Sequence, residues 1–164
     1  MTTARAIAYG TLTVGVLDAL DAIVFFGLRN SVPAYRIFQA IASGLLGPAS
    51  FQGGAATVAL GVVCHFTVAC GIVTVFVLVS TRWPALARRP FLWGPLYGIA
   101  AYLVMNLVVV PLSAAGPSRH PIAVVVNGLL IHMIGVGTPA ALAARAAQGP
   151  EGTRSGGRPN VPVG

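Results

Sequence analysis

Four long runs of apolar residues divide the chain, and each is long enough to form a helix that crosses a bilayer. They cover residues 6–28, 55–80, 91–113 and 122–144. A spanning helix needs about 20 residues, because each residue adds about 1.5 Å and the hydrocarbon core is about 30 Å thick. Valine and isoleucine are frequent in two of these runs, but uninterrupted runs of this length favour helices over strands in lipid. The pattern predicts an all-α membrane protein, a four-transmembrane-helix bundle over residues 1–147.

Two segments outside these runs carry signals of their own. Pro33 suits the first turn of a helix, and the apolar residues that follow predict a short extra helix at 33–47 in the first outer connection. This helix can lie on the membrane surface or enter as a re-entrant segment, and the surface position is favoured. Residues 148–164 are rich in Gly, Pro, Ser and Arg without apolar periodicity, which predicts a disordered cytoplasmic tail.

Composition supports the membrane interpretation. Only 8% of the 164 residues are charged, whereas a soluble domain carries about 25%. The formal net charge is +7 and every basic residue is arginine. The arginines lie mainly at the ends of the apolar runs, where they anchor helices at the membrane surface. The lipid bilayer is therefore the expected partner, and nucleic acid is not.

The arginines also predict an orientation. With the N-terminus inside, seven arginines fall on the inner side and three on the outer side. The inner set is Arg5, Arg82, Arg88, Arg89, Arg145, Arg154 and Arg158, and the outer set is Arg29, Arg36 and Arg119. Inner loops carry the excess of positive charge in membrane proteins. Both termini are therefore expected in the cytoplasm.

Two acidic residues lie inside the first apolar run. Asp18 and Asp21 are three residues apart, and the chain's third acid, Glu151, lies in the polar tail. A carboxylate within the hydrocarbon costs about 2.5–3.5 kcal/mol on insertion scales, so it usually faces a bundle interior or a water-filled cavity. This pair is the strongest sequence signal for a functional site.

Polar side chains from all four runs lie at matching depths. Counting inward from the outer end of each helix, one set lies roughly 8–11 Å deep and a second set roughly 15 Å deep. The shallower set is Asp21, Asn106 and Asn127, and the deeper set is Asp18, His65 and His132. We therefore expect these side chains to share one pocket in the outer half of the membrane.

Several chemistries fit such a pocket. Buried carboxylates and histidines can bind or relay protons or hold a cation, and two histidines with one carboxylate resemble a transition-metal ligand set. His65 and His132 could instead be axial ligands of a haem. Arg36, with Gln39 beside it on the outer connection, could form an ion pair with Asp21. Asparagine and histidine can also simply hydrogen-bond across helices and hold them together.

Other motifs point away from catalysis. The chain contains no P-loop, nucleophile elbow or zinc-protease motif, so we expect no enzyme and the leading interpretation needs no cofactor. Gly94 and Gly98 form a GxxxG motif, which continues at four-residue spacing to Tyr102 and Asn106. Such small residues pack helices within a bundle or between the protomers of a homo-oligomer, and packing within the bundle is favoured.

The second half of the chain resembles a known family. The stretch from Gly98 to Asn106 continues to Pro111-Leu112, and Gly128-Leu-Leu-Ile-His132 follows before Arg145. Together with His65-Phe66 in the second predicted helix, these short motifs resemble YagU-like bacterial inner-membrane proteins over the last three predicted helices. The resemblance implies a multi-pass protein of the bacterial inner membrane, linked to envelope or acid stress. It supplies no catalytic residues, and it does not include the pair of aspartates.

Three function classes remain open at this stage. The first is proton-linked or small-solute transport, or sensing, with Asp18 and Asp21 as charge carriers. The second is a structural or assembly subunit whose polar residues only pair helices. The third is a haem-binding redox anchor. The first is favoured.

Overall fold

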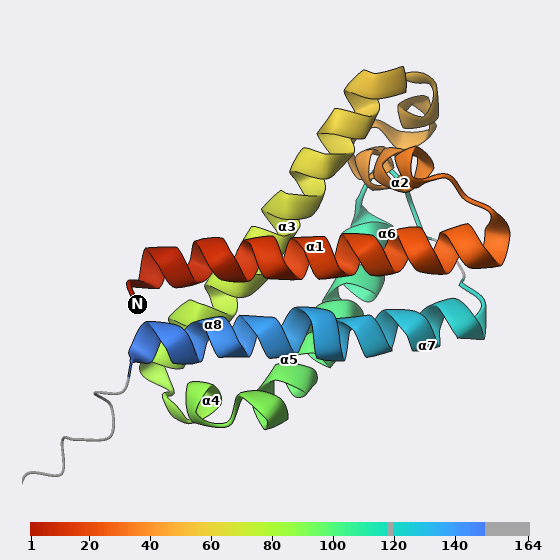
Figure 1. The fold of residues 1–164 in the computed structure, drawn as a ribbon. Coiled ribbons are helices and arrows are strands. Elements are labelled where there is room, and N and C mark those ends of the chain that lie inside the picture. The colour runs from red at the N-terminus through yellow and green to blue at the C-terminus, as the bar shows by residue number, and fades with distance from the viewer. Residues whose placement is uncertain (118–119, 150–164) are drawn as a thin grey trace, which may run out of the picture.

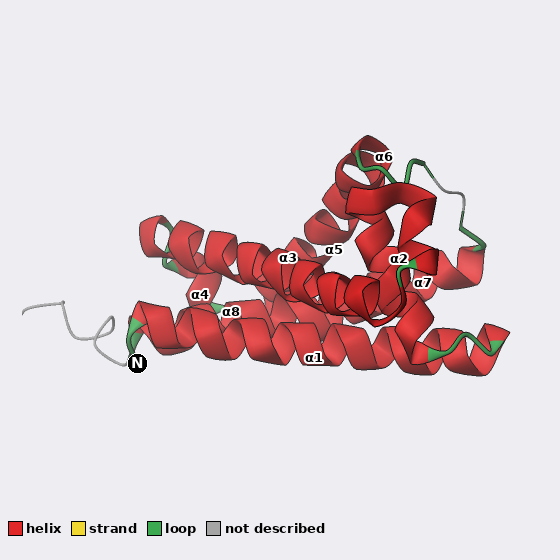
Figure 2. Cartoon of the chain, turned by 90° about the horizontal axis from the view of Figure 1, so that it is seen from above, coloured by secondary structure: helices red, strands yellow, loops and turns green. Residues whose placement is uncertain are grey.

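The computed structural model describes residues 1–117 and 120–149, and within them the chain forms helices and loops but no strand (Figure 2). The first half contains α1 (Thr3–Asn30), α2 (Ala34–Leu46), the 3₁₀ helix η1 (Gly47–Gln52), α3 (Gly54–Arg82) and α4 (Ala85–Arg88). The second half contains α5 (Pro90–Val104), the π-helical turn η2 (Met105–Val109), α6 (Val110–Leu112), α7 (Ile122–Ile131), the π-helical turn η3 (His132–Gly137) and α8 (Thr138–Gln148).

Within the described residues, four continuous helical segments are long and apolar enough to cross a membrane. They are Thr3–Asn30, Gly54–Arg82, Pro90–Leu112 and Ile122–Gln148. The third span joins α5, η2 and α6, and the fourth joins α7, η3 and α8. The predicted all-α bundle is confirmed, and the chain is a multi-pass integral membrane protein. The predicted tail lies outside the described residues from residue 150 onward.

Three of the four spans are longer than the apolar runs that predicted them, and the third has the same length. The first helix begins at Thr3, where the Thr2 side chain accepts a hydrogen bond from the Arg5 N–H, and it ends at Asn30. Ser31 then adopts a left-handed conformation, with φ of 53°, and its N–H donates to the Gly27 carbonyl. Capping and exposed polar residues let the helix continue past the apolar stretch, which hydrophobicity alone does not reveal.

A widened turn interrupts the third and the fourth span. The Val110 N–H donates to the Met105 carbonyl and the Thr138 N–H to the Met133 carbonyl, in each case five residues back. A proline follows directly, at Pro111 and Pro139. Proline has no N–H, and its ring collides with the carbonyl four residues back, so a wider turn accommodates it. These turns contain Asn106 and His132 respectively, so both polar side chains start from non-α backbone.

The bundle is most tightly packed at one end, which we call the closed end. Figure 1 shows the start of α1 beside the end of α8 there, and the Met1 nitrogen donates to the Ala146 carbonyl at 3.4 Å. Small side chains allow this approach: a Cβ on Gly10 would lie 2.8 Å from Val73 and 2.9 Å from Ala143. The buried residues of the closed end are Val14, Ala69, Val73, Phe76, Val77, Ala87, Val136, Ala140, Ala141, Ala143 and Ala144.

The short helix expected between the first two spans is present as α2, continued by η1. It packs on the start of α3, where Gly61 leaves room for the backbone carbonyl of Phe38. The buried Gln39 side chain donates to the Thr57 hydroxyl at 3.3 Å. At its other end the Gly44 carbonyl accepts from the Ala114 N–H at 2.9 Å. Helix α2 is therefore packed against α3 and the connection that follows α6 (Figure 1).

Candidate functional site

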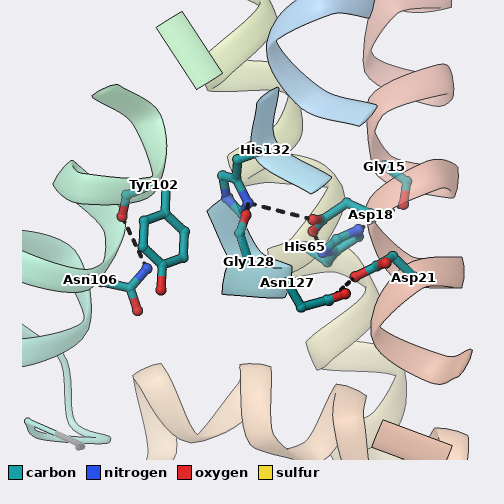
Figure 3. Close-up of polar contacts among 9 residues, drawn as sticks. All are labelled: Gly15, Asp18, Asp21, His65, Tyr102, Asn106, Asn127, Gly128 and His132. Carbon is teal, nitrogen blue, oxygen red and sulfur yellow. Dashed lines mark hydrogen bonds and ion pairs between the residues drawn. The ribbon is translucent and has the colours of Figure 1, made fainter. Parts of the chain in front are cut away.

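The centre of the candidate site is Asp18, which lies between two imidazole rings. One carboxylate oxygen, Oδ2, is 4.0 Å from Nδ1 of His65 on α3, and the other, Oδ1, is 4.0 Å from Nδ1 of His132 in η3 (Figure 3). The His65 and His132 side chains are 10% and 16% exposed and the Asp18 side chain is 28% exposed. Three spans thus each contribute one titratable group to a single, largely buried cluster.

The hydrogen bond of His65 fixes where its proton is. Its Nε2 lies 2.8 Å from the Gly15 carbonyl oxygen of α1. A carbonyl oxygen only accepts, so Nε2 must carry the hydrogen in this contact. In the neutral ring, Nδ1 would then turn a lone pair toward the Asp18 carboxylate. The two groups are 4.0 Å apart, so an additional proton on either one would turn this approach into an attractive contact.

His132 is held in the same way on the opposite side. Its Nδ1 lies 2.9 Å from the Gly128 carbonyl oxygen, one turn earlier in its own span, and must donate to it. This N–H also faces Asp18 from 4.0 Å, which is too long for a direct hydrogen bond but close enough for electrostatic attraction. The His132 and Tyr102 rings pack in a T-shaped arrangement, with the ring centres 5.3 Å apart.

The second acid has a partner of a different kind. The Asn127 amide of α7 donates to Asp21 Oδ2 at 2.7 Å, so this contact joins the first and fourth spans (Figure 3). A hydrogen bond to a carboxylate at this distance is strong, because the acceptor carries the charge. Asp21 is therefore satisfied by a neutral amide, whereas Asp18 faces two groups that can themselves change charge.

Both acids line one cavity of about 200 Å³. Its walls come from α1, from α5 with η2, and from α7 with the residues before it. The lining residues are Asp18, Asp21, Ala22, Phe25, Phe26, Tyr102, Asn106, His120, Val124, Asn127, Gly128 and Ile131. Asn106 reaches this cavity from η2, although its amide donates only to the Tyr102 carbonyl of its own helix at 3.0 Å.

Glycines set the spacing of these walls. A Cβ at Gly98 would collide with the His132 carbonyl, so this glycine lets α5 touch the turn that holds His132. A Cβ at Gly128 would lie 2.5 Å from the Tyr102 ring. The GxxxG motif thus packs helices against each other within the described chain, where Gly94 lies against the backbone of Thr138. Close approach of this kind is the usual role of small residues between membrane helices.

The polar side chains that the sequence predicts at the same depth largely lie close to one another in the structure. The deeper set, Asp18, His65 and His132, forms the cluster around Asp18. In the shallower set, Asp21 and Asn127 are bonded, while Asn106 lines the same cavity without contacting either of them through a hydrogen bond. The sequence did not identify Phe25, Phe26 and His120 as lining residues. Phe25 lies one helical turn beyond Asp21, which was an available signal.

The structure corrects the partner expected for Asp21. The Arg36 guanidinium donates to the Phe51 carbonyl at 3.2 Å and lies 5.7 Å from the centres of the Tyr35 and Phe51 rings. Gln39 is turned toward α3, where its amide donates to Thr57 and to the Gly54 carbonyl. The packing of α2 on α3 thus directs Arg36 toward η1 and Gln39 toward α3, and Asn127 takes the place expected for Arg36.

The cofactor alternatives do not fit the geometry. Among the described residues, no group of three or more His, Cys, Asp or Glu side chains could hold a metal ion. A haem ligated by His65 and His132 would need its plane between the two rings, but the Asp18 carboxylate occupies that space. One nitrogen of each ring is also engaged by a backbone carbonyl.

Comparison of the chain with protein-family models, with curated proteins and with solved structures gave no match. The resemblance to YagU-like proteins therefore stays a prediction.

Proposed function

We propose that this integral membrane protein is proton-linked, and that the cluster of Asp18, His65 and His132 takes up and releases a proton during transport or sensing. The observation that carries this proposal is the carboxylate between two imidazoles, 4.0 Å from each. Asp18, His65 and His132 together have more atoms that can bind a proton than can be protonated at the same time. Histidine is the side chain that changes charge most readily near neutral pH.

The charges around the cluster support this role. Asp18 faces His65 from α3, His132 from η3 and Asp21 from its own helix, and Tyr102 of α5 stands against His132. Gain or loss of one proton changes the net charge of this group, and two of its members, Asp18 and Asp21, line the cavity. A cavity of about 200 Å³ beside them gives a small solute or a proton access to Asp18.

The closed end of the bundle supplies the proposed orientation. Arg5, Arg82, Arg88, Arg89 and Arg145 lie around this end and are exposed. By the distribution of positive charge, we propose that it faces the cytoplasm of a bacterial cell and that the cavity opens toward the outer face. In this arrangement the protein is a non-enzymatic inner-membrane protein of the YagU-like kind.

A structural role is the second candidate, and three contacts favour it. His65 is tied to the Gly15 carbonyl, His132 to the Gly128 carbonyl and Asn127 to Asp21. Two of these bonds join different spans, so the same side chains could serve only to hold helices together in an assembly subunit.

The two acids provide a matched test. Wild type, Asp18→Asn and Asp21→Asn are reconstituted in liposomes that contain a pH-sensitive dye, and an acid-outside gradient is imposed. Protonation of the His65 and His132 rings is followed in parallel by nitrogen NMR across pH. We expect Asp18→Asn to abolish collapse of the gradient and to change the titration of both rings. Asp21→Asn, the same chemical change three residues away, should change the titration of the rings less, because only Asp18 lies 4.0 Å from both.

The outcomes separate the candidate functions. Coupled ring titration without proton movement would favour sensing over transport. If Asp18→Asn melts at a clearly lower temperature while ring titration and proton movement are unchanged, the proton-linked role is wrong and the structural role stands.

A further inference from the structure

A second cavity, separate from the aspartates, lies at the closed end between α3, α4 and α5. It has a volume of about 230 Å³ and its lining is almost entirely apolar. The lining residues are Val75, Phe76, Val79, Leu86, Trp93, Leu96 and Tyr97. The one hydroxyl among them, that of Tyr97, donates to the Ile72 carbonyl at 2.7 Å. We call this cavity the apolar groove.

The apolar groove has a firm floor and exposed walls. Phe76 is 3% exposed and packs edge-to-face on Tyr97, with ring centres 4.8 Å apart. The walls differ, because Val75 and Leu96 are 52% and 48% exposed. In a chain that spans a membrane, such a groove opens on lipid. A hydrocarbon chain is the ligand that its lining can accept without leaving a polar group unpaired.

Three arginines stand where the groove-lining segments end. Arg82 is the last residue of α3 and follows Val79 by three positions. Arg88 is the last residue of α4, two positions after Leu86. Arg89 precedes α5, and its carbonyl accepts from the N–H of Trp93, a lining residue one turn later. All three are exposed, and one end of the groove is therefore basic.

These arginines have no acidic partner in the part of the chain that the structure describes. The acids in that part are Asp18 and Asp21, which face His65, His132 and Asn127. Guanidinium groups bind phosphate through paired hydrogen bonds, and basic pockets between membrane helices commonly bind acidic lipid headgroups. Within the described residues, the basic cluster at the end of the apolar groove therefore has no anion beside it.

We propose that the apolar groove is a binding site for one anionic phospholipid. An acyl chain lies along Val75, Leu96 and Tyr97, and the phosphate lies against Arg82, Arg88 and Arg89. Trp93, 37% exposed between the two parts, suits the boundary between hydrocarbon and headgroups. The inference does not depend on the proton-linked role, because the groove shares no residue with the cavity around Asp18.

The test compares two pairs of arginines at the same end of the bundle. The full chain is purified in detergent, and retention of added phosphatidylglycerol or phosphatidylcholine is measured by native mass spectrometry. Arg88→Gln/Arg89→Gln is compared with Arg5→Gln/Arg145→Gln, which removes the same charge away from the groove. We expect wild type to retain one phosphatidylglycerol in preference to phosphatidylcholine. The groove pair should weaken this retention about tenfold or more, since each cation near a headgroup matters, and the control pair should not.

A second variant tests the chain-binding part. Leu96→Trp places a larger ring at a half-exposed position, so folding is retained and the groove is partly filled. It should lower retention of phosphatidylglycerol while leaving the arginines intact. Soluble glycerol phosphate serves as the competitor. Equal loss in both arginine pairs, unchanged retention in Leu96→Trp, or displacement of the lipid by equimolar glycerol phosphate would each overturn the proposal.

Discussion

The two ends of the bundle are built from the same helices but by different rules. At the closed end, α1 and α8 meet through Ala6, Gly10 and alanines of α8, with side chains that are almost fully buried. Around the aspartates, α7 has no fully buried residue and a cavity of about 200 Å³ separates the walls. One end is held by close contact of small residues, and the other by a few polar bonds.

This difference shows where the chain can change shape. Lipid is as apolar as the interior of the bundle, so small residues stabilise membrane helices mainly by bringing backbones close together. At the closed end the helices are already in close contact and cannot approach further. At the other end, the geometry depends on side chains whose hydrogen bonds respond to protonation. The proposed proton-linked cluster thus lies at the end of the bundle where the packing is more open.

The largest effect should come from filling the closed end. A Cβ at Gly94 would lie 2.7 Å from the Thr138 Cα and 2.9 Å from the Gly137 carbonyl, both backbone atoms that cannot move aside alone. Gly94→Leu should therefore destabilise the fold by about 3 kcal/mol. Thermal unfolding in detergent measures this, with Gly71→Leu as the control, because nothing lies within 4 Å of a Cβ there. Equal melting temperatures would contradict the comparison.

The second-largest loss of stability should come from breaking the hydrogen bond between Asn127 and Asp21, which joins the first and fourth spans. Asn127→Leu removes the donor to Asp21 and leaves a carboxylate without its 2.7 Å partner, which should cost about 2 kcal/mol. Chemical unfolding of the protein in micelles measures the loss. The double variant Asp21→Leu/Asn127→Leu should be more stable than Asn127→Leu, since no unpaired charge remains. A double variant less stable than the single one would show that this bond does not govern the polar end.

A smaller effect should follow loss of one hydroxyl beside the closed end. Tyr97→Phe removes the donor to the Ile72 carbonyl but keeps the ring on Phe76, so unfolding should become easier by about 1 kcal/mol. Tyr9, 62% exposed, provides the control substitution Tyr9→Phe. Stability equal in the two variants would mean that packing of the ring alone joins α5 to α3.

The smallest effect is expected at Asn106. Its amide bonds to a carbonyl of the same helix, so Asn106→Leu should change stability by less than about 0.5 kcal/mol. It should nevertheless make the cavity wall less polar and alter labelling of a cysteine placed at Val124, which also lines the cavity. Strong destabilisation by Asn106→Leu would instead assign this residue a role in holding helices together.

The sequence predicted the depth of each polar side chain along its helix better than the direction in which that side chain points. The rise per residue gave axial positions for Asp18, His65 and His132, and the structure places them in contact. The rotation of each helix was not predictable in the same way, because apolar residues surround every span and no single face is marked as inner. Asn106, which bonds within its own helix, shows that limit.

Partners from the connections were the least predictable. Arg36 lies on the outer connection that follows the first span, and opposite charge alone allowed a pair with Asp21. The structure instead holds its guanidinium at the Phe51 carbonyl, because α2 folds back onto α3 and η1 brings Phe51 beside it. Such a fold-back depends on local contacts such as Gly61 against Phe38, which carry no periodic signal.

The pairing of the aspartates has a consequence for biosynthesis. Asp18 and Asp21 enter the membrane with the first span, but His65 belongs to the second and Asn127 and His132 to the fourth. A nascent chain therefore exposes two costly carboxylates that find all their partners only when the fourth span is inserted. The cost of placing these carboxylates in the membrane is therefore offset late, when the last span completes the site.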